Sequence, residues 1–295
     1  MTKTDLKVGF LCNNKCEFCV QGDKRTIHGD IPTKEVLKSL EEGRKTSDQV
    51  VITGGEPTIK KDFLKIVTYA KKIGYKLIQI QTNGRMFASN EFANNTIEAG
   101  ANSFSIGLHG HTKEVHDTLT QAKHSFFQAV KGIQNLKKLH QFVGTNTVIV
   151  QKNYMHLEEI AKMLIFLKVD QFQLAFVHAI GTAGDLFHTV TPRYKDIMPH
   201  VKAALDIGIK NNIKVMTEAI PYCFMDGYEE YIGENFIPRT KIFDVNVLED
   251  YTEYRLNEGK QKTDKCKTCK HFNICEGPWR EYPENFGWEE MVPVV

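Results

Sequence analysis

The chain has 295 residues, enough for one barrel-sized domain with an appendage or for two ordinary domains. Its 38 Lys and Arg residues nearly balance its 36 Asp and Glu residues, so the net charge of +2 gives no sign of a surface dedicated to nucleic acid or anionic membranes. The sequence begins without the apolar stretch of an export signal, and no segment approaches the ~18 apolar residues of a membrane span. We therefore expect a cytoplasmic protein in which clustered cysteines bind metal or do chemistry.

Short apolar runs alternate with longer amphipathic segments over the first two thirds of the chain. The strands that we expect occupy residues 6–11, 49–53, 75–81, 102–108, 142–150 and 172–178. The helices that we expect occupy residues 33–43, 61–74, 91–100, 125–139, 156–168 and 193–212. Six βα units in a row predict an α/β fold with a parallel sheet, either barrel-like or doubly wound. In both, the ligand lies beyond the carboxyl ends of the strands.

From about residue 218 the helical spacing fades, and aromatic residues, glycines and prolines become frequent. This tail holds four of the seven cysteines and has little material for a core of its own. We therefore expect two domains, a core over residues 1–217 and a small cysteine-rich module over residues 218–295. A bound metal would help to order the module.

The stretch CNNKCEFC places Cys12, Cys16 and Cys19 directly after the first expected strand. Three thiolates with this spacing can converge on one small object, and an iron–sulfur cluster is the obvious candidate. A structural zinc site needs four ligands, and no fourth cysteine or histidine follows before His28. A cluster held by three thiolates leaves one iron open for a ligand that does not come from the protein.

This CxxxCxxC stretch, with Phe18 just before its last cysteine, resembles the signature of the radical S-adenosylmethionine (SAM) superfamily. The resemblance implies a partial (β/α)6 barrel of the TIM type and a [4Fe–4S] cluster on Cys12, Cys16 and Cys19. It implies that SAM binds the fourth iron and is cleaved to a 5′-deoxyadenosyl radical, which takes hydrogen from a substrate. The electron would come from a donor such as flavodoxin or ferredoxin.

A glycine-rich loop after the second expected strand strengthens the resemblance. Its residues are Thr53, Gly54, Gly55, Glu56 and Pro57. The glycines let backbone approach a ligand closely, and the glutamate offers an acceptor to an ammonium group. Alone, the loop would indicate an ordinary strand-to-helix turn. In this place it is similar to the family's GGEP motif, which binds the SAM amino group.

Four further residues lie in or after later expected strands and match the family more weakly. Thr82 and Asn83 resemble the family's TNG segment and are expected to line the active site, unless they serve only the turn. Asn146 resembles the polar residue of the fifth strand that meets SAM. The glycine-rich turn at Gly181 resembles one that packs near adenine.

The segment after the fourth expected strand resembles a family stretch but departs from it. Gly107 stands where serine is common, and His109 stands where aspartate is common, which puts the usual contact with the SAM carboxylate in doubt. His109, His111 and His116 could bind a substrate or move a proton. We expect at least two of these histidines to be solvated at the start of a helix.

The tail contains CKTCKHFNIC, which supplies Cys266, Cys269 and Cys275, and Cys223 could complete a set of four. The group resembles the twitch or SPASM appendage of the same superfamily, although Trp279 stands where the SPASM pattern has another cysteine. The resemblance implies one auxiliary [4Fe–4S] cluster, as in the shorter twitch form. A structural zinc ion would suit the same four residues, and Cys223 could instead be a thiol that donates hydrogen or holds the substrate.

The resemblance thus implies a radical SAM enzyme with an auxiliary cluster that transfers an electron or anchors the substrate. We expect the substrate to be a small molecule or a peptide delivered by a separate protein, because the first expected strand begins near residue 5. An iron–sulfur electron carrier or scaffold would explain the cysteines but not the GGEP loop. A zinc-stabilised binding protein for RNA would need a basic stripe, which the sequence lacks.

Overall fold

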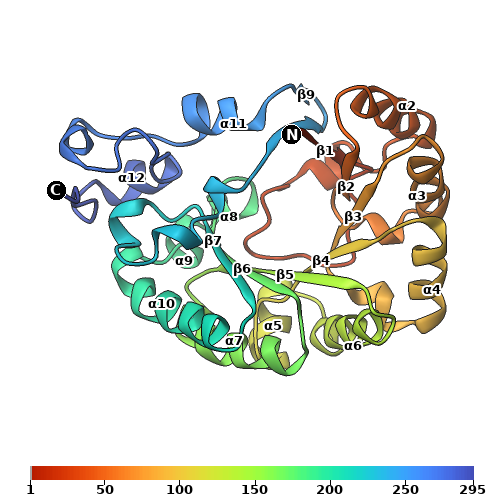
Figure 1. The fold of residues 1–295 in the computed structure, drawn as a ribbon, viewed down its shortest axis with the longest axis horizontal. Helices are drawn as coiled ribbons and strands as arrows, with labels where there is room; N and C mark the ends of the chain where they lie inside the picture. The colour runs from red at the N-terminus through yellow and green to blue at the C-terminus, as the bar shows by residue number, and fades with distance from the viewer. Residues whose placement is uncertain (1) are drawn as a thin grey trace.

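A single curled sheet organises the computed structural model, which describes residues 2–295. The strands are β1 (Thr2–Lys7), β2 (Gln49–Thr53), β3 (Leu77–Thr82), β4 (Ser103–Gly107), β5 (Phe142–Ile149), β6 (Gln171–Phe176), β7 (Lys214–Glu218), β8 (Arg239–Phe243) and β9 (Val247–Leu248). Their order in the sheet is β7-β6-β5-β4-β3-β2-β1-β8-β9, and every neighbouring pair is parallel except β8 and β9. Figure 1 shows the sheet curling into an open barrel with helices outside it.

The longer helices are amphipathic, and those outside the barrel turn their buried faces toward the outer face of the sheet (Figure 1). The helices are α1 (Lys24–Ile27), α2 (Thr33–Arg44), α3 (Phe63–Lys72), α4 (Asn90–Ala99), α5 (Lys113–Thr120), α6 (Ser125–Lys138), α7 (Leu157–Phe166), α8 (Thr182–Asp185), α9 (Phe187–Val190), α10 (Tyr194–Lys210), α11 (Tyr251–Tyr254) and α12 (Glu281–Phe286). Buried apolar residues such as Leu40, Ile66 and Phe104 fill the layer between helices and sheet. None of the helices within residues 2–295 is long and apolar enough to cross a membrane.

The predicted α/β class with six βα units is confirmed, and the barrel-like alternative is the one that forms. The first strand differs from its expected place, because it occupies Thr2–Lys7 instead of residues 6–11. Its inward positions are Lys3, Asp5 and Lys7, which line a cavity inside the barrel. A search for apolar runs therefore passed over a strand that is apolar on one face only.

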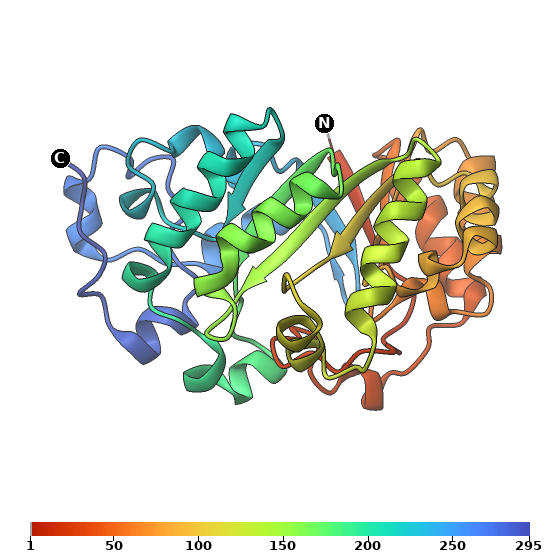
Figure 2. The ribbon, with the colours of Figure 1, turned by 90° about the horizontal axis from the view of Figure 1, so that it is seen from below.

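The tail adds strands that the sequence pattern did not predict. β8 lies parallel to β1, with Thr4 opposite Lys241, so the tail extends the sheet of the core. From there the chain runs to α12, which lies beside α9 and α10 in both views (Figures 1 and 2). The backbone N–H of Tyr194 donates to the Tyr282 hydroxyl at 3.1 Å, which fixes the tail to the start of α10. The boundary between residues 217 and 218 stays a prediction.

Candidate functional site

The three cysteines of the CNNKCEFC loop lie together at the carboxyl edge of the sheet. Burial raises the pKa of Cys12 to about 11, and the nearby Cys19 adds to the shift. Burial also raises the pKa of Cys16, and both other thiols add to that shift. Crowded, partly buried thiols resist ionisation until a cationic group binds them, because metal coordination deprotonates a thiol outright. The loop therefore fits the metal group that its spacing predicts.

The loop after β3 holds the cysteine loop in position. Asn83 donates a side-chain hydrogen bond to the Asn13 side chain at 2.6 Å, and Arg85 donates to the Asn14 side chain at 2.9 Å. Arg85 also donates to the backbone carbonyl of Asn13. The sequence interpretation included Asn83 but missed Arg85, although a cation directly after the TNG segment was a visible signal.

Glu56 joins the GGEP loop to the loop after β3. One carboxylate oxygen accepts hydrogen bonds from the Thr58 backbone at 3.1 Å and from the Thr82 hydroxyl at 2.7 Å. The other oxygen accepts from the Asn83 backbone at 2.7 Å. Burial raises the pKa of Glu56, although these hydrogen bonds oppose the shift. The structure thus brings together Glu56, Thr82 and Asn83, three of the residues predicted to form the site.

The two glycines of the GGEP loop allow it to pack backbone against backbone with the loop after β1. A β-carbon at Gly54 would lie 2.2 Å from the carbonyl oxygen of Gly9. A β-carbon at Gly55 would lie 2.3 Å from the carbonyl oxygen of Leu11. Any side chain at either position would push the cysteine loop away from β2, so these glycines set the place of the loop. Beside them, Thr53 accepts the backbone hydrogen bond of Val8 at 2.9 Å, and Pro57 is buried.

Gly107 and His109 form a matched pair at the end of β4. A β-carbon at Gly107 would lie 2.9 Å from Nε2 of His109, so the imidazole occupies space that a side chain at position 107 would need. Nδ1 of His109 accepts the backbone hydrogen bond of Val148 at 3.2 Å, and the ring meets Phe18 edge-on with centroids 4.6 Å apart. Because Nδ1 accepts, Nε2 carries the proton of the neutral ring.

The expectation that at least two histidines of this segment are solvated is wrong. His109 and His116 are 7% and 1% exposed, and the His109 backbone N–H donates to Nδ1 of His116 at 3.1 Å. Burial lowers the pKa of His116 to about 4 and lowers that of His109 well below its usual value. Both rings are therefore neutral near pH 7. The start of α5 folds back over the strand end, which local sequence does not reveal.

Asn146 and Gly181 lie where the cysteine loop meets the barrel interior. Asn146 pairs in register with Gly107 and lines the central cavity, and its Oδ1 is buried without a hydrogen-bond partner among residues 2–295. Gly181 has φ +58°, and a β-carbon there would lie 2.7 Å from the carbonyl oxygen of Val20. The backbone N–H of Thr182 donates to the carbonyl of Cys19 at 3.0 Å. The Gly181 turn therefore packs on the cysteine loop itself.

A polar cavity of about 530 Å³ occupies the barrel interior next to the cysteine loop, beginning at Val20 and Gln21. Barrel interiors are ordinarily filled by bulky branched side chains. The polar side chains that line this one include Lys3, Asp5, Lys7, Gln79, Gln81, Ser105, Gln171, Gln173 and Glu218. The sequence interpretation missed them, although the alternation in IQIQ and QFQ marks strands with one polar face.

The four cysteines of the tail line one small cavity. Cys223, Cys266, Cys269 and Cys275 share its wall with apolar residues. Burial raises the pKa of Cys223 to about 12, and the other three thiols add to the shift. Neither cysteine group, among residues 2–295, has three side chains arranged around a single metal ion. The assignment of these four thiols to a metal group therefore stays a proposal, supported by their shared cavity.

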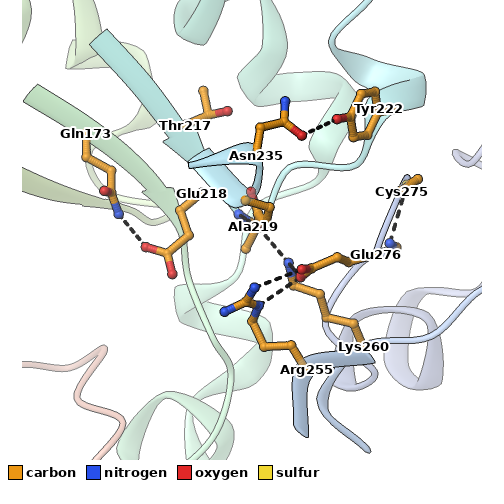
Figure 3. A network of polar contacts seen from close by, with 12 residues as sticks. Gln173, Thr217, Glu218, Ala219, Tyr222, Asn235, Arg255, Lys260, Cys275 and Glu276 are labelled. Atoms are coloured by element: carbon orange, nitrogen blue, oxygen red, sulfur yellow. Dashed lines mark hydrogen bonds and ion pairs between the residues drawn. The ribbon is translucent and has the colours of Figure 1, made fainter. Parts of the chain in front are cut away.

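A buried ion network connects this cysteine cavity to the end of β7 (Figure 3). Lys260 pairs with Glu234 at 2.6 Å and with Glu276 at 2.9 Å, and Arg255 makes two hydrogen bonds of 2.9 Å to Glu276. Glu234 also accepts the backbone hydrogen bond of Ala219 at 2.8 Å. Since Glu276 directly follows Cys275, the network ties a cysteine of the tail to the barrel.

Comparison with known proteins identifies the family. The sequence matches the Radical SAM superfamily over residues 6–164. The chain belongs to this superfamily of enzymes. Membership implies a [4Fe–4S] cluster and SAM, and it confirms the resemblance drawn from the cysteine loop.

Curated relatives of this radical SAM protein are distant. The "Probable GTP 3′,8-cyclase" of Sulfurisphaera tokodaii is 27% identical over 62% of the chain and 59% of its own length. The "AdoMet-dependent heme synthase" of Oleidesulfovibrio alaskensis is 24% identical over 59% of the chain and 45% of its own length. The matches thus span less than two thirds of these relatives.

Solved structures share the fold over nearly the whole chain. "Native anSMEcpe with bound AdoMet and Kp18Cys peptide" has a TM-score of 0.68 at 16% identity and covers 100% of this chain and 92% of that one. Streptococcus suis SuiB bound to S-adenosylmethionine has a TM-score of 0.67 at 16% identity and covers 94% and 72%. At this identity the likeness establishes the fold, and the predicted radical SAM barrel is confirmed.

Proposed function

We propose that the protein cleaves SAM reductively and abstracts hydrogen from a substrate bound in the barrel cavity. The observation that carries the proposal is the position of Cys12, Cys16 and Cys19, which are close together beside the polar interior cavity. These three thiolates would hold the [4Fe–4S] cluster. The chemistry that cluster and SAM supply when bound is cleavage to methionine and a 5′-deoxyadenosyl radical, with an electron from a flavodoxin or ferredoxin.

The residues around the cysteine loop would position SAM. Glu56 keeps the GGEP loop against Thr82 and Asn83. Among residues 2–295, one of its oxygens accepts a single hydrogen bond and can accept another from an ammonium group. Asn146 presents an unpartnered carbonyl oxygen to the cavity, which is costly to bury unless a ligand donates to it. His109 presents Nε2–H beside Gly107 and would replace the donor that the family's serine supplies.

We further propose that residues 218–295 form a twitch-like module with one auxiliary [4Fe–4S] cluster. Its ligands would be Cys223, Cys266, Cys269 and Cys275, which share one cavity. The count of seven cysteines favours this assignment, because the three of the first loop leave one iron open and the remaining four complete a second ligand set. The module would transfer an electron or anchor the substrate. A zinc ion on the same four residues, or a free Cys223 thiol, is the competing arrangement.

The test is anaerobic reconstitution with iron and sulfide, reduction in the presence of SAM, and chromatographic detection of 5′-deoxyadenosine. We expect product from the native protein and none from Cys16→Ala. Absence of product from a protein with its full iron content would overturn the proposal and favour an electron carrier or scaffold. Elemental analysis of iron and zinc on the same sample decides the metal of the tail, since a zinc-stabilised module would retain one zinc ion per chain.

A further inference from the structure

The central cavity carries charged side chains that the proposed SAM site does not use. Three lysines and three carboxylates line it, namely Lys3, Lys7, Lys24, Asp5, Asp244 and Glu218. Two of the lysines are already neutralised by ion pairs, Lys7 with Asp5 at 3.0 Å and Lys24 with Asp244 at 2.8 Å. Lys3 and Glu218 remain without an ion-pair partner among residues 2–295.

Lys3 on β1 and Glu218 on β7 both line the cavity, and they lie near enough for the Glu218 carboxylate to act on the pKa of Lys3. Lys3 donates to the Gln79 side chain at 3.3 Å, and Gln173 donates to the Glu218 carboxylate (Figure 3). Burial lowers the pKa of Lys3, although Asp5 and Glu218 oppose the shift, and burial raises the pKa of Glu218, although Lys260 and Arg255 oppose it. Nearby charges thus offset only part of the cost of burying each charge. A ligand that brought an opposite charge to each of them would offset this cost.

The balance of charge also constrains the ligand. Some curated relatives are named GTP 3′,8-cyclases, and a nucleoside triphosphate would bring several negative charges into the cavity. Triphosphates are held by unpaired Lys and Arg side chains. Within the described residues 2–295, the cavity lining contains no arginine, and two of its three lysines are already paired with carboxylates. A ligand without a large net charge fits this lining better.

Resting on the function proposed above, we propose that the substrate is a small zwitterion of the size of a free amino acid. Its acidic group lies against Lys3 and Gln79, and its ammonium group lies against Glu218 and Gln173. The other amides and hydroxyls of the wall, on Gln81, Gln171 and Ser105, accept and donate hydrogen bonds to the rest of the molecule. The size follows from the cavity, which is about 530 Å³ and must also hold SAM.

The experiment measures binding by calorimetry to the cluster-loaded protein saturated with SAM, with the twenty free L-amino acids and GTP as probes. We expect at least one amino acid to bind and to increase 5′-deoxyadenosine formation, and GTP to do neither. Lys3→Met and Glu218→Gln should each weaken that binding at least tenfold. The matched surface variants Lys76→Met and Glu249→Gln, at positions 80% and 75% exposed, should leave it unchanged.

Blocked forms of the same amino acid show which protein residue binds its carboxylate and which binds its ammonium group. Because they are also tested on the native protein, a folding defect in a variant cannot explain the result. The amide, which lacks the carboxylate, should bind at least tenfold more weakly than the parent to the native protein but equally with the parent to Lys3→Met. The N-acetyl form should show the same pattern with Glu218→Gln. Binding of GTP, failure of every amino acid to bind, or equal losses in all variants would overturn the inference.

The two proposals fail separately in this design. A protein that forms 5′-deoxyadenosine without added substrate but binds no amino acid contradicts the substrate inference alone. A protein that binds an amino acid through Lys3 and Glu218 but never cleaves SAM contradicts the proposed function and leaves the assignment of the cavity intact.

Discussion

The two cysteine groups of this protein differ in what surrounds them. The first group has three thiols, lies in a loop at the edge of the sheet and adjoins a large polar cavity. The second has four thiols, shares a small cavity with apolar residues and is tied to the barrel by buried ion pairs. An incomplete ligand set beside open polar space suits a site where a further ligand binds and is exchanged. A complete set in a small, mostly apolar cavity suits a resident group.

The largest expected effect comes from removing one cysteine from each of the two groups. Cys16→Ala should remove about four irons per chain and all SAM cleavage, because the [4Fe–4S] cluster at the active site loses a ligand. Cys269→Ala should also remove about four irons but should keep SAM cleavage in the absence of substrate. Iron analysis and 5′-deoxyadenosine formation measure both outcomes. Equal loss of SAM cleavage in the two variants would contradict the division of roles.

The next effect concerns the ion network that holds the second group. Lys260→Met should lower the free energy of unfolding by about 3–5 kcal/mol, because it leaves the carboxylates of Glu234 and Glu276 buried with less compensation. Lys260 is only 3% exposed, so water cannot replace the lost partner. Chemical denaturation of the reconstituted protein measures the loss. Lys45→Met, which breaks the exposed pair with Glu42, is the control and should change nothing measurable.

The first cysteine group could be predicted from sequence, and the environment of the second could not. Cys12, Cys16 and Cys19 lie within eight residues, so their spacing can be read directly from the sequence. The Lys260 network joins positions 234, 255, 260 and 276, and only the folded chain determines that these charges are buried together. The pairing of β8 with β1 likewise depends on closure of the barrel over more than two hundred residues.

The polar lining of the central cavity could be predicted in part. Glutamines alternate with apolar residues in two of the strands, at Gln79, Gln81, Gln171 and Gln173. This alternation predicts strands with one polar face. The prediction of strands from short apolar runs did not distinguish the two faces of each strand. Burial of His109 and His116 had no local signal, because it arises from the chain folding back over the end of β4.

A third prediction tests the packing beside the first group. Gly107→Ser should lower the free energy of unfolding by about 1–3 kcal/mol, because its β-carbon would lie 2.9 Å from Nε2 of His109 and would displace the ring. In the His109→Ala background the same substitution should cost much less, since the space is then free. Thermal or urea unfolding of the four proteins completes a double-mutant cycle. Additive losses would show that Gly107 and His109 do not compete for space.

The smallest expected effect is a difference in pH dependence between two buried glutamates. Burial raises the pKa of Glu218, so its contribution to stability is present at low pH and is lost as the pH rises above the ordinary value of 4.5. Glu218→Gln, which cannot ionise, should therefore gain stability relative to the native protein as the pH rises from about 4 to 8. Melting temperatures across this range measure the trend.

Glu276 provides the opposite case within the same chain. Burial alone would raise its pKa, but hydrogen bonds and ion pairs with Arg255 and Lys260 bring it below the ordinary value. Its contribution is therefore present at neutral pH and is lost as the pH falls through the lowered pKa, so Glu276→Gln should be most destabilised near neutrality and least in acid. Parallel trends in Glu218→Gln and Glu276→Gln would contradict the distinction between them. Opposite trends would show that ionisation is penalised at Glu218, which has no direct ion pair among residues 2–295, and is stabilised at Glu276, which is paired directly with Arg255 and Lys260.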